Sequence, residues 1–257
     1  MANESADQNL PTRAPTYSSA WVDEHTISIA GKAVEEKSNE ITAIPDVLDS
    51  IDLTGAVVSI DAMGTQTDIA QMIVESEADY VLALKRNHRH LSEDVKDAFT
   101  GRYTQFTYST LDKDHGRVEE RIYTALRPQE VLDESQYEPW KNLSSLVQVE
   151  RLVTFSDGTE RRDKQYYLSS LPAEAVERIG AYIRGHWGIE NRLHWHLDVT
   201  FREDLCRARK AYAAQNLNTI RKLALAIVSQ RKDKLSIRKR LFTAALNIDY
   251  LKELLKI

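Results

Sequence analysis

Continuous apolar runs alternate with helical spacing in the first half of the chain. The run Ala56 to Ile60 is apolar almost throughout, as in a strand that is buried on both faces of a sheet. Residues 65–76 then have the spacing of a helix, and a second apolar run covers Tyr80 to Leu84. Asp61 directly follows the first run. Open α/β sheets place functional groups at the carboxyl ends of their strands, so Asp61 is a candidate site residue, with a turn or N-cap role as the alternative.

A second acid lies on the apolar side of a predicted helix. Glu190 is close to the middle of the apolar stripe, and His186 and His194 lie on its two borders. A Glu is almost never fully buried unless it is paired or bound to a metal, so this position indicates either an ion pair or a site. At about 100° per residue, the stripe consists of Ile179, Ile183, Leu193, Leu197 and Phe201.

Strand-like alternation occurs in two other regions. Residues 16–22 and 26–34 predict two strands, with Asp23 and Glu24 in the turn between them. From Gln105 to Leu171, alternating segments are broken by turn sequences rich in Asp and Gly, which predicts antiparallel hairpins. This second region looks like a β insertion within an α/β core.

Charge is distributed unevenly along the chain. The net charge is −5, yet residues 207–240 carry eleven Lys and Arg against one acid, a net charge of +10. Two predicted helices, at 213–230 and 234–246, could bury their Leu and Ile there while presenting bases to phosphate. A solvated helix face is the alternative interpretation of such a segment.

Five segments occur in order along most of the chain: KSNEITAIP from Lys37, VVSIDAMGTQ from Val57, DYVLALKRN from Asp79, DHGRVEERIY from Asp114 and HWGIENRLHWHLDVTFRED from His186. Together they resemble the DDE transposases of insertion sequences, in particular the group that includes the H-repeat-associated proteins. The resemblance implies an RNase H-like catalytic core in which three acids hold two divalent cations. By motif position, Asp61 matches the second Asp of that family, and Glu190 matches its Glu.

The first Asp of the family has no counterpart here. In relatives it lies in a strand, within a motif resembling AIDGKTLRGS, ahead of the segment that begins here at Thr16. Residues 1–15 are polar, contain two prolines and match no strand. We therefore interpret the chain as an N-terminally shortened member. The expected fold is α/β, an RNase H-like core lacking its first strand, with a β-rich insertion and a helical C-terminal region.

Five parts are expected along the chain. They are a polar N-terminal segment (1–15), the first part of the RNase H-like core (16–104), the β-rich insertion (105–171), the core helix that carries Glu190 (172–205) and the basic helical C-terminal region (206–257).

The resemblance also implies chemistry and partners. Strand cleavage at phosphorus uses two Mg²⁺ ions, which prefer carboxylate oxygens, so Asp61 and Glu190 are the expected catalytic and metal-binding residues. His186, Asn191 and His194 are expected to support them or to contact phosphate. The expected partner is DNA at transposon ends, and a homodimer is compatible with the family. Because the first Asp is missing, we expect a DNA transposase that is inactive as encoded. The expected DNA-binding residues are Arg207, Arg209, Lys210, Arg221, Lys222, Arg231, Lys232, Lys234, Arg238, Lys239 and Arg240.

Two other functions remain open. His186, Glu190 and His194 repeat at i, i+4 and i+8, so imidazoles on one helix side could bind Zn²⁺ in a hydrolase, although the spacing is not HExxH. The chain could also be a non-catalytic DNA-binding or interaction remnant of a transposase. A single cysteine, Cys206, excludes a disulfide framework. No apolar run has the length of a membrane span and the N-terminus lacks signal-peptide features, so a cytoplasmic, bacterial protein is expected.

Overall fold

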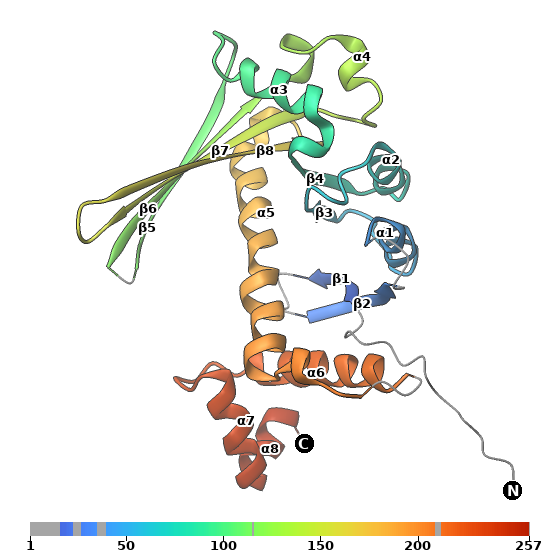
Figure 1. The fold of residues 1–257 in the computed structure, drawn as a ribbon, viewed down its shortest axis with the longest axis vertical. Coiled ribbons are helices and arrows are strands. Elements are labelled where there is room, and N and C mark those ends of the chain that lie inside the picture. The colour runs from blue at the N-terminus through green and yellow to red at the C-terminus, as the bar shows by residue number, and fades with distance from the viewer. Residues whose placement is uncertain (1–15, 23–26, 35–39, 115, 209–211, 257) are drawn as a thin grey trace, which may run out of the picture. The chain divides into compact units, whose positions relative to one another are not determined.

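The structure of the protein is a computed structural model. It divides into two compact units, which we call the sheet unit (Leu48–His186) and the helical unit (Met1–Val47 with Trp187–Ile257). Figure 1 shows the elements of both units. The residues described are 16–22, 27–34, 40–114, 116–208 and 212–256.

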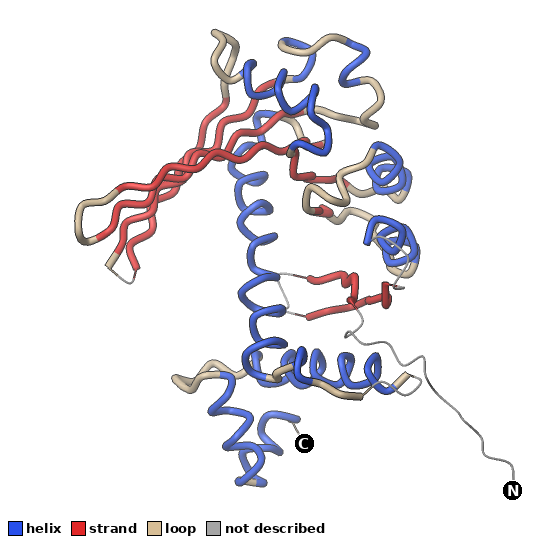
Figure 2. Tube along the Cα trace, in the orientation of Figure 1, coloured by secondary structure: helices blue, strands red, loops and turns tan. Residues whose placement is uncertain are grey.

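Six strands form one sheet in the sheet unit, in the order β3-β4-β8-β7-β6-β5. β3 (Val57–Ile60) and β4 (Asp79–Leu84) are parallel, and the other neighbouring pairs are antiparallel. The strands of the expected insertion are therefore hydrogen-bonded to β4 through β8 and extend the same sheet, as the long red strands in Figure 2 show. These strands are β5 (Phe106–Asp114), β6 (Arg117–Leu126), β7 (Ser145–Phe155) and β8 (Glu160–Ser169).

The strands and helices predicted for this unit are confirmed, with bounds shifted by a few residues. Gly116 and Gly158 have φ values of 74° and 83° and lie directly before β6 and between β7 and β8. Both sit in hairpin turns that need a left-handed backbone, which glycine adopts at no steric cost. The helices between the strands are α2 (Thr67–Glu75), α3 (Arg89–Ala98) and α4 (Glu134–Tyr137), with 3-10 turns at Arg86–His88, Pro128–Glu130 and Ala173–Ala175.

Helix α5 (Val176–Ile189) packs on the sheet. Its residues Ile179 and Ile183 are buried in one hydrophobic cluster with Tyr123 of β6 and Val149 of β7. Gly180 allows the helix to approach closely, because a Cβ added there would lie 3.1 Å from the Tyr123 ring. The absence of a side chain at this position therefore allows the close spacing between helix and sheet.

The chain continues from α5 as two π-helical segments, Glu190–His194 and His196–Thr200. The predicted apolar stripe is buried at Leu193 and Leu197, as it is in α5, but these two residues belong to a different hydrophobic cluster, in the helical unit. A regular period of 100° does not hold through π-helical turns, which take more residues per turn. The single stripe expected from the sequence therefore serves two cores.

The helical unit contains a hairpin and three C-terminal helices. β1 (Thr16–Val22) and β2 (Ile27–Val34) pair antiparallel as predicted, while Asp23 and Glu24 lie outside the described residues. Leu225 and Leu254 pack with Leu193 and Leu197 in the core of this unit. Among the described residues, no helix is long and apolar enough to cross a membrane. The helices are α6 (Ala213–Ser229), α7 (Ile237–Leu246) and α8 (Ile248–Leu255), and α1 (Glu40–Asp49) follows β2.

Glu119 of β6 is a buried carboxylate held by arginines. Its side chain forms ion pairs with Arg121 and Arg151, and the Arg117 guanidinium lies 3.8 Å away. The hydrogen bonds that Arg151 donates lower the pKa of Glu119, against the opposite effect of burial, and the positive charge of Arg121 adds to the lowering. The charged carboxylate therefore contributes to the stability of the sheet.

The stabilisation by the Glu119 carboxylate depends on pH in a predictable direction. A carboxyl group with a lowered pKa stabilises the fold above its unfolded pKa of 4.5, and the stabilisation is lost as the pH falls through the folded value. We expect Glu119→Gln to lower the free energy of unfolding at pH 7 by about 1–3 kcal/mol. The loss should shrink as the pH falls below 4.5, because the carboxyl group of the unfolded chain then takes up a proton before the native carboxylate does. Urea unfolding at pH 7 and pH 3.5 measures this loss of unfolding free energy, with Glu120→Gln on the opposite face of β6 as the control. Equal losses at both pH values would contradict the expectation.

Candidate functional site

Asp61 is exposed and lies immediately after β3, in the turn that leads to α2. Its Oδ1 accepts a hydrogen bond from the Gly64 N–H at 3.3 Å. The Thr65 hydroxyl, which is fully buried, contacts the carbonyl oxygens of Asp61 and Ala83 at 3.0 and 2.7 Å. The turn is therefore tied to the end of β4. Gln66, not Asp61, is the N-cap of α2, so the alternative role that remains for Asp61 is the turn bond to Gly64.

A second loop, between β4 and α3, lies against the Asp61 turn. The Asn87 amide donates a hydrogen bond to the carbonyl oxygen of Ala62, and His88 Nε2 donates one to the carbonyl oxygen of Thr65 at 2.6 Å. The His88 ring also meets Trp140 edge to face, at 5.2 Å between centroids. The sequence patterns predicted the strand at Tyr80–Leu84 but used the residues that follow it only within a family marker, and so missed this contact. The signal available in the sequence was the parallel pair of strands, whose carboxyl ends meet at one edge.

Helix α5 reaches β3 two residues before Asp61. His186 Nδ1 and Ser59 Oγ lie 3.1 Å apart, at hydrogen-bonding distance. This contact places His186 beside the strand that ends at Asp61, and its supporting role stays a prediction. Glu190 follows one turn later, as the first residue of the π-helical stretch, and its side chain lies outside what the structure describes.

The other predicted residues of this helix have varied surroundings. The Asn191 amide is exposed and lies 3.4 Å from the Trp187 carbonyl oxygen, a bond within the helix. His194 is half-buried. Neighbouring His196 contacts the Thr200 hydroxyl at 3.0 Å, and burial lowers the pKa of its imidazole. Sequence and structure together therefore leave Asn191 and His194 as predictions.

The described donor set fits a divalent cation only in part. Asp61 offers an exposed carboxylate, the ligand type that hard cations prefer. No group of three His, Cys, Asp or Glu that could hold a metal ion is found among the residues the structure describes. The Glu190 side chain lies outside the described residues, and the two-metal interpretation and the zinc alternative both stay predictions.

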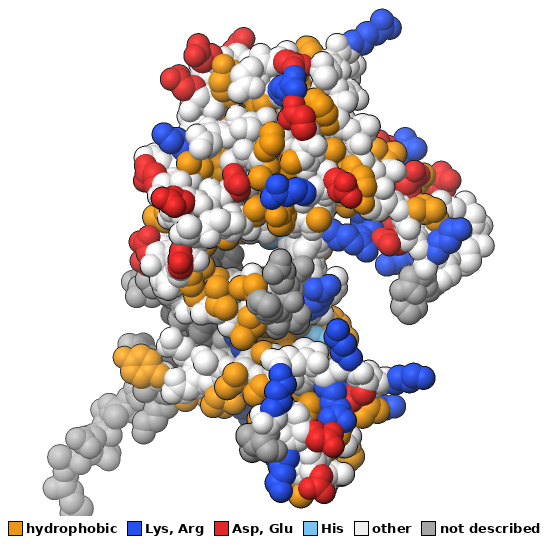
Figure 3. Space-filling view, turned by 180° about the vertical axis from the view of Figure 1, so that it is seen from behind, with side chains coloured by type: hydrophobic (Ala, Val, Ile, Leu, Met, Phe, Trp, Pro, Cys, Tyr) orange, Lys and Arg blue, Asp and Glu red, His pale blue; other side chains and the backbone are white. Residues whose placement is uncertain are grey.

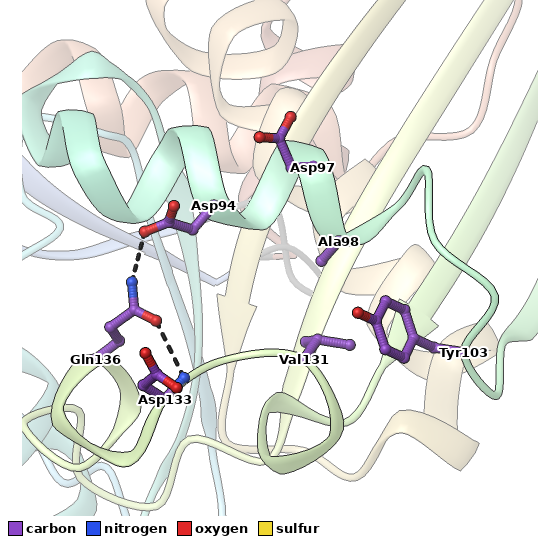
Figure 4. Close-up of a pocket in the computed structure, with 7 residues that line it drawn as sticks. All are labelled: Asp94, Asp97, Ala98, Tyr103, Val131, Asp133 and Gln136. Carbon is purple, nitrogen blue, oxygen red and sulfur yellow. Dashed lines mark hydrogen bonds between the residues drawn. The ribbon is translucent and has the colours of Figure 1, made fainter.

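An open recess of about 480 Å³ lies elsewhere in the sheet unit, beside the second half of α3. Figure 4 shows Gln136 bridging it, with its amide donating to Asp94 and its oxygen accepting from the Asp133 N–H. Asp97 also lines the recess. Three carboxylates make it unsuited to phosphate, and it contains none of the predicted site residues.

Several residues of the basic segment are engaged within the helical unit. Arg240 is 8% exposed; its guanidinium bonds to the Asp233 carboxylate and to the carbonyl oxygens of Asp233 and Val228. Arg231 pairs with Asp233 and Glu253. Arg240 therefore belongs to the interior of this unit, where its guanidinium is engaged with protein oxygens and not exposed to a phosphate.

Two more of these bases are held by side chains of the same unit. Arg221 pairs with Glu203 at 3.0 Å, and Lys222 Nζ lies 2.6 Å from Ser19 Oγ. Burial lowers the pKa of Lys222. Figure 3 accordingly shows basic and acidic side chains interspersed over the C-terminal helices at its lower end. Arg209 and Lys210 lie outside the described residues, and the exposed bases are Arg207, Lys232, Lys234, Arg238 and Lys239.

Comparisons with known proteins agree on one family. The model of the family described as "Transposase DDE domain" matches residues 16–227. The chain is 34% identical over 245 residues to "H repeat-associated putative transposase YhhI" of Escherichia coli (strain K12), covering 92% of this chain and 64% of that protein. It is 36% identical over 249 residues to "Putative transposase YncI" of Escherichia coli O157:H7, covering 92% and 62%. The chain thus spans less than two thirds of the length of these relatives.

Among solved structures, the piggyBac transposase synaptic complex with hairpin DNA aligns with a TM-score of 0.42 and 12% identity, over 91% of this chain and 46% of that one. A likeness at this level carries no argument about the site.

Proposed function

Because this chain belongs to the Transposase DDE domain family, we propose that it is the core portion of a DNA transposase whose arrangement is RNase H-like. The family depends on divalent metal ions, and Mg²⁺ is the proposed ion. Asp61 and Glu190 are the proposed carboxylate ligands. Bound there, two such ions would activate the attacking oxygen and stabilise the leaving oxygen of a phosphodiester. The observation that carries the proposal is the position of Asp61 at the adjoining carboxyl ends of β3 and β4.

The chain's own residues have distinct roles in this proposal. The Thr65 and Gly64 contacts hold the Asp61 turn, so that the carboxylate does not have to be ordered when a metal arrives. His186 positions the end of α5 against β3, one turn ahead of Glu190. The phosphate of DNA is negative and the site is acidic, so bases must lie close to it for the strand to bind.

We also propose that residues 1–257 alone are catalytically incomplete. The family motif has three acids, and only Asp61 and Glu190 have matching positions here. The second candidate function, a DNA-binding remnant without catalysis, is favoured by one observation, the exposed bases of the loop before α7 and of α7 itself.

Metal binding tests the proposal without requiring activity. Titration calorimetry with Mg²⁺, or Mn²⁺ paramagnetic resonance, is expected to detect binding that Asp61→Asn and Glu190→Gln each weaken at least tenfold. Asp68→Asn, an exposed acid in the first turn of α2, is the control. Weakening by the control to the same extent would show non-specific counterion binding and contradict the assignment.

DNA binding by the C-terminal region should depend on the exposed bases alone. Replacing Lys232, Lys234, Arg238 and Lys239 by Gln is expected to lower the slope of log affinity against log salt by up to about 3.6, since each phosphate contact contributes about 0.9. Fluorescence anisotropy with a labelled duplex at several salt concentrations measures this slope. The same change at four exposed bases of the sheet unit is the control, and these are Arg102, Lys113, Lys141 and Arg161. An unchanged slope after replacement of the four C-terminal bases would show that this segment is a solvated helix face that does not contact DNA.

A further inference from the structure

The loop that contacts the Asp61 turn carries a cluster of positive charge. Lys85 and Arg86 are exposed, and they begin the sequence KRNHRH that leads into α3. Within the part of the chain that the structure describes, neither side chain takes part in an ion pair, whereas Arg89 in the next turn pairs with Glu93 at 3.0 Å. Two neighbouring cations are thus left to solvent beside a candidate catalytic acid.

Backbone geometry fixes these cations near Asp61. In the parallel ladder, Ile60 is the partner of Leu82, so the chain leaves the sheet at Asp61 and at Lys85 on the same edge. Neighbouring strands lie about 4.8 Å apart and each residue advances about 3.3 Å, which brings the two backbones within roughly 10 Å of each other. A long Lys or Arg side chain spans much of that distance.

The loop is held independently of its charges. Asn87 and His88 bond to the carbonyl oxygens of Ala62 and Thr65, both in the Asp61 turn. His88 in turn packs on Trp140. These contacts position Lys85 and Arg86 without using their charged groups, so the ammonium and guanidinium retain their donors for a ligand.

We propose that Lys85 and Arg86 form a phosphate-binding site for the DNA strand that passes Asp61. The inference rests on the proposed function and deepens it, because it names where the substrate backbone is held. A phosphodiester group would place its negative charge between the two cations. The next phosphodiester bond of the same strand would then face the Asp61 turn. Arg offers a planar fork for two phosphate oxygens and Lys a compact point charge, which together suit one phosphodiester group.

The test compares variants of the full chain by anisotropy with a labelled duplex, in the presence of Ca²⁺ and over a range of salt. Lys85→Gln with Arg86→Gln is expected to lower the salt slope by about 1.8, because two phosphate contacts are lost. Arg102→Gln with Lys141→Gln removes the same charge from exposed positions elsewhere in the sheet unit and should leave the slope unchanged. Lys85→Arg with Arg86→Lys keeps both charges and should retain the native slope. Circular dichroism confirms that each variant is folded.

The outcomes distinguish a failure of the Lys85 and Arg86 phosphate site from a failure of the proposed function. If the unaltered chain does not bind DNA, the proposed function itself fails. If it binds and the double Gln variant keeps the native slope, the phosphate site is overturned while the proposed function stands. If the control pair reduces the slope as much as the Lys85 and Arg86 pair does, the effect is one of net charge, and the site is likewise overturned.

Discussion

Extending the chain at its N-terminus with an Asp-bearing strand of the AIDGKT type is expected to produce Mg²⁺-dependent DNA cleavage, which we do not expect from residues 1–257 alone. Among the described strands, β3 pairs with β4 alone and β1 with β2 alone, so each has an edge without a partner strand. All four residues of β3 are only half-buried, although three of them are Val or Ile. An added strand would both pair with such an edge and supply the first acid of the family motif.

The added strand is expected to raise both the stability of the chain and its rate of DNA cleavage. Unpaired backbone groups cost about 1–3 kcal/mol each when they are buried, so filling an edge should raise stability by several kcal/mol. The missing acid would complete the ligands of a two-metal site, and we expect cleavage of supercoiled plasmid to rise by at least about 1,000-fold over the chain alone. A nicking assay with and without Mg²⁺ measures the rate.

A matched extension separates stability from catalysis. The same added strand with Asn in place of its Asp should restore the melting temperature and not the cleavage. Asp61→Asn in the extended chain should abolish cleavage. Mg²⁺-dependent nicking by residues 1–257 themselves, lost on Asp61→Asn, would show that the first Asp of the family motif is not needed for cleavage.

Arg240→Met is expected to destabilise the helical unit by about 3 kcal/mol, while its removal should change the salt dependence of DNA binding little. The guanidinium links Asp233 to the Val228 carbonyl oxygen at the end of α6, and Tyr250 of α8 donates a hydrogen bond to the same Asp233. Without Arg240, the Val228 carbonyl oxygen loses the guanidinium donor and Asp233 loses one of its several donors inside the unit. Thermal unfolding measures the loss, with the exposed neighbour Lys239→Met as the control.

The same network predicts a pH dependence. Burial raises the pKa of Asp233. The hydrogen bonds from the Leu235 N–H, the Arg240 guanidinium and the Tyr250 hydroxyl outweigh this effect and lower the pKa to about 2. Because the folded pKa lies below its ordinary value of 3.8, this acid stabilises the unit above about pH 4 and the effect is lost as the pH falls toward 2. The difference in melting temperature between the native chain and Arg240→Met should therefore narrow in acid. A constant difference from pH 7 to pH 2.5 would exclude the ion pair as its source.

The sequence by itself determined the elements that depend on local pattern. Apolar runs and alternation predicted β3, β4 and the four strands of the insertion, and Gly116 and Gly158 marked the turns between them. The place of Asp61 at the end of β3 follows from the same pattern. These features are encoded within a few residues, because the burial of a strand and the backbone of a turn are properties of short segments.

Only the tertiary structure decided which segments meet. Nothing in the local pattern shows that β8 pairs with β4, so that the insertion continues the core sheet. Arg240 and Lys239 are adjacent basic residues, yet Arg240 is buried against Asp233 and Lys239 is exposed. The Asn87 and His88 contacts with the Asp61 turn likewise join residues more than twenty positions apart. Strand partners and the neutralisation of a charge depend on groups that are distant along the chain, so the fold, and not local periodicity, determines them.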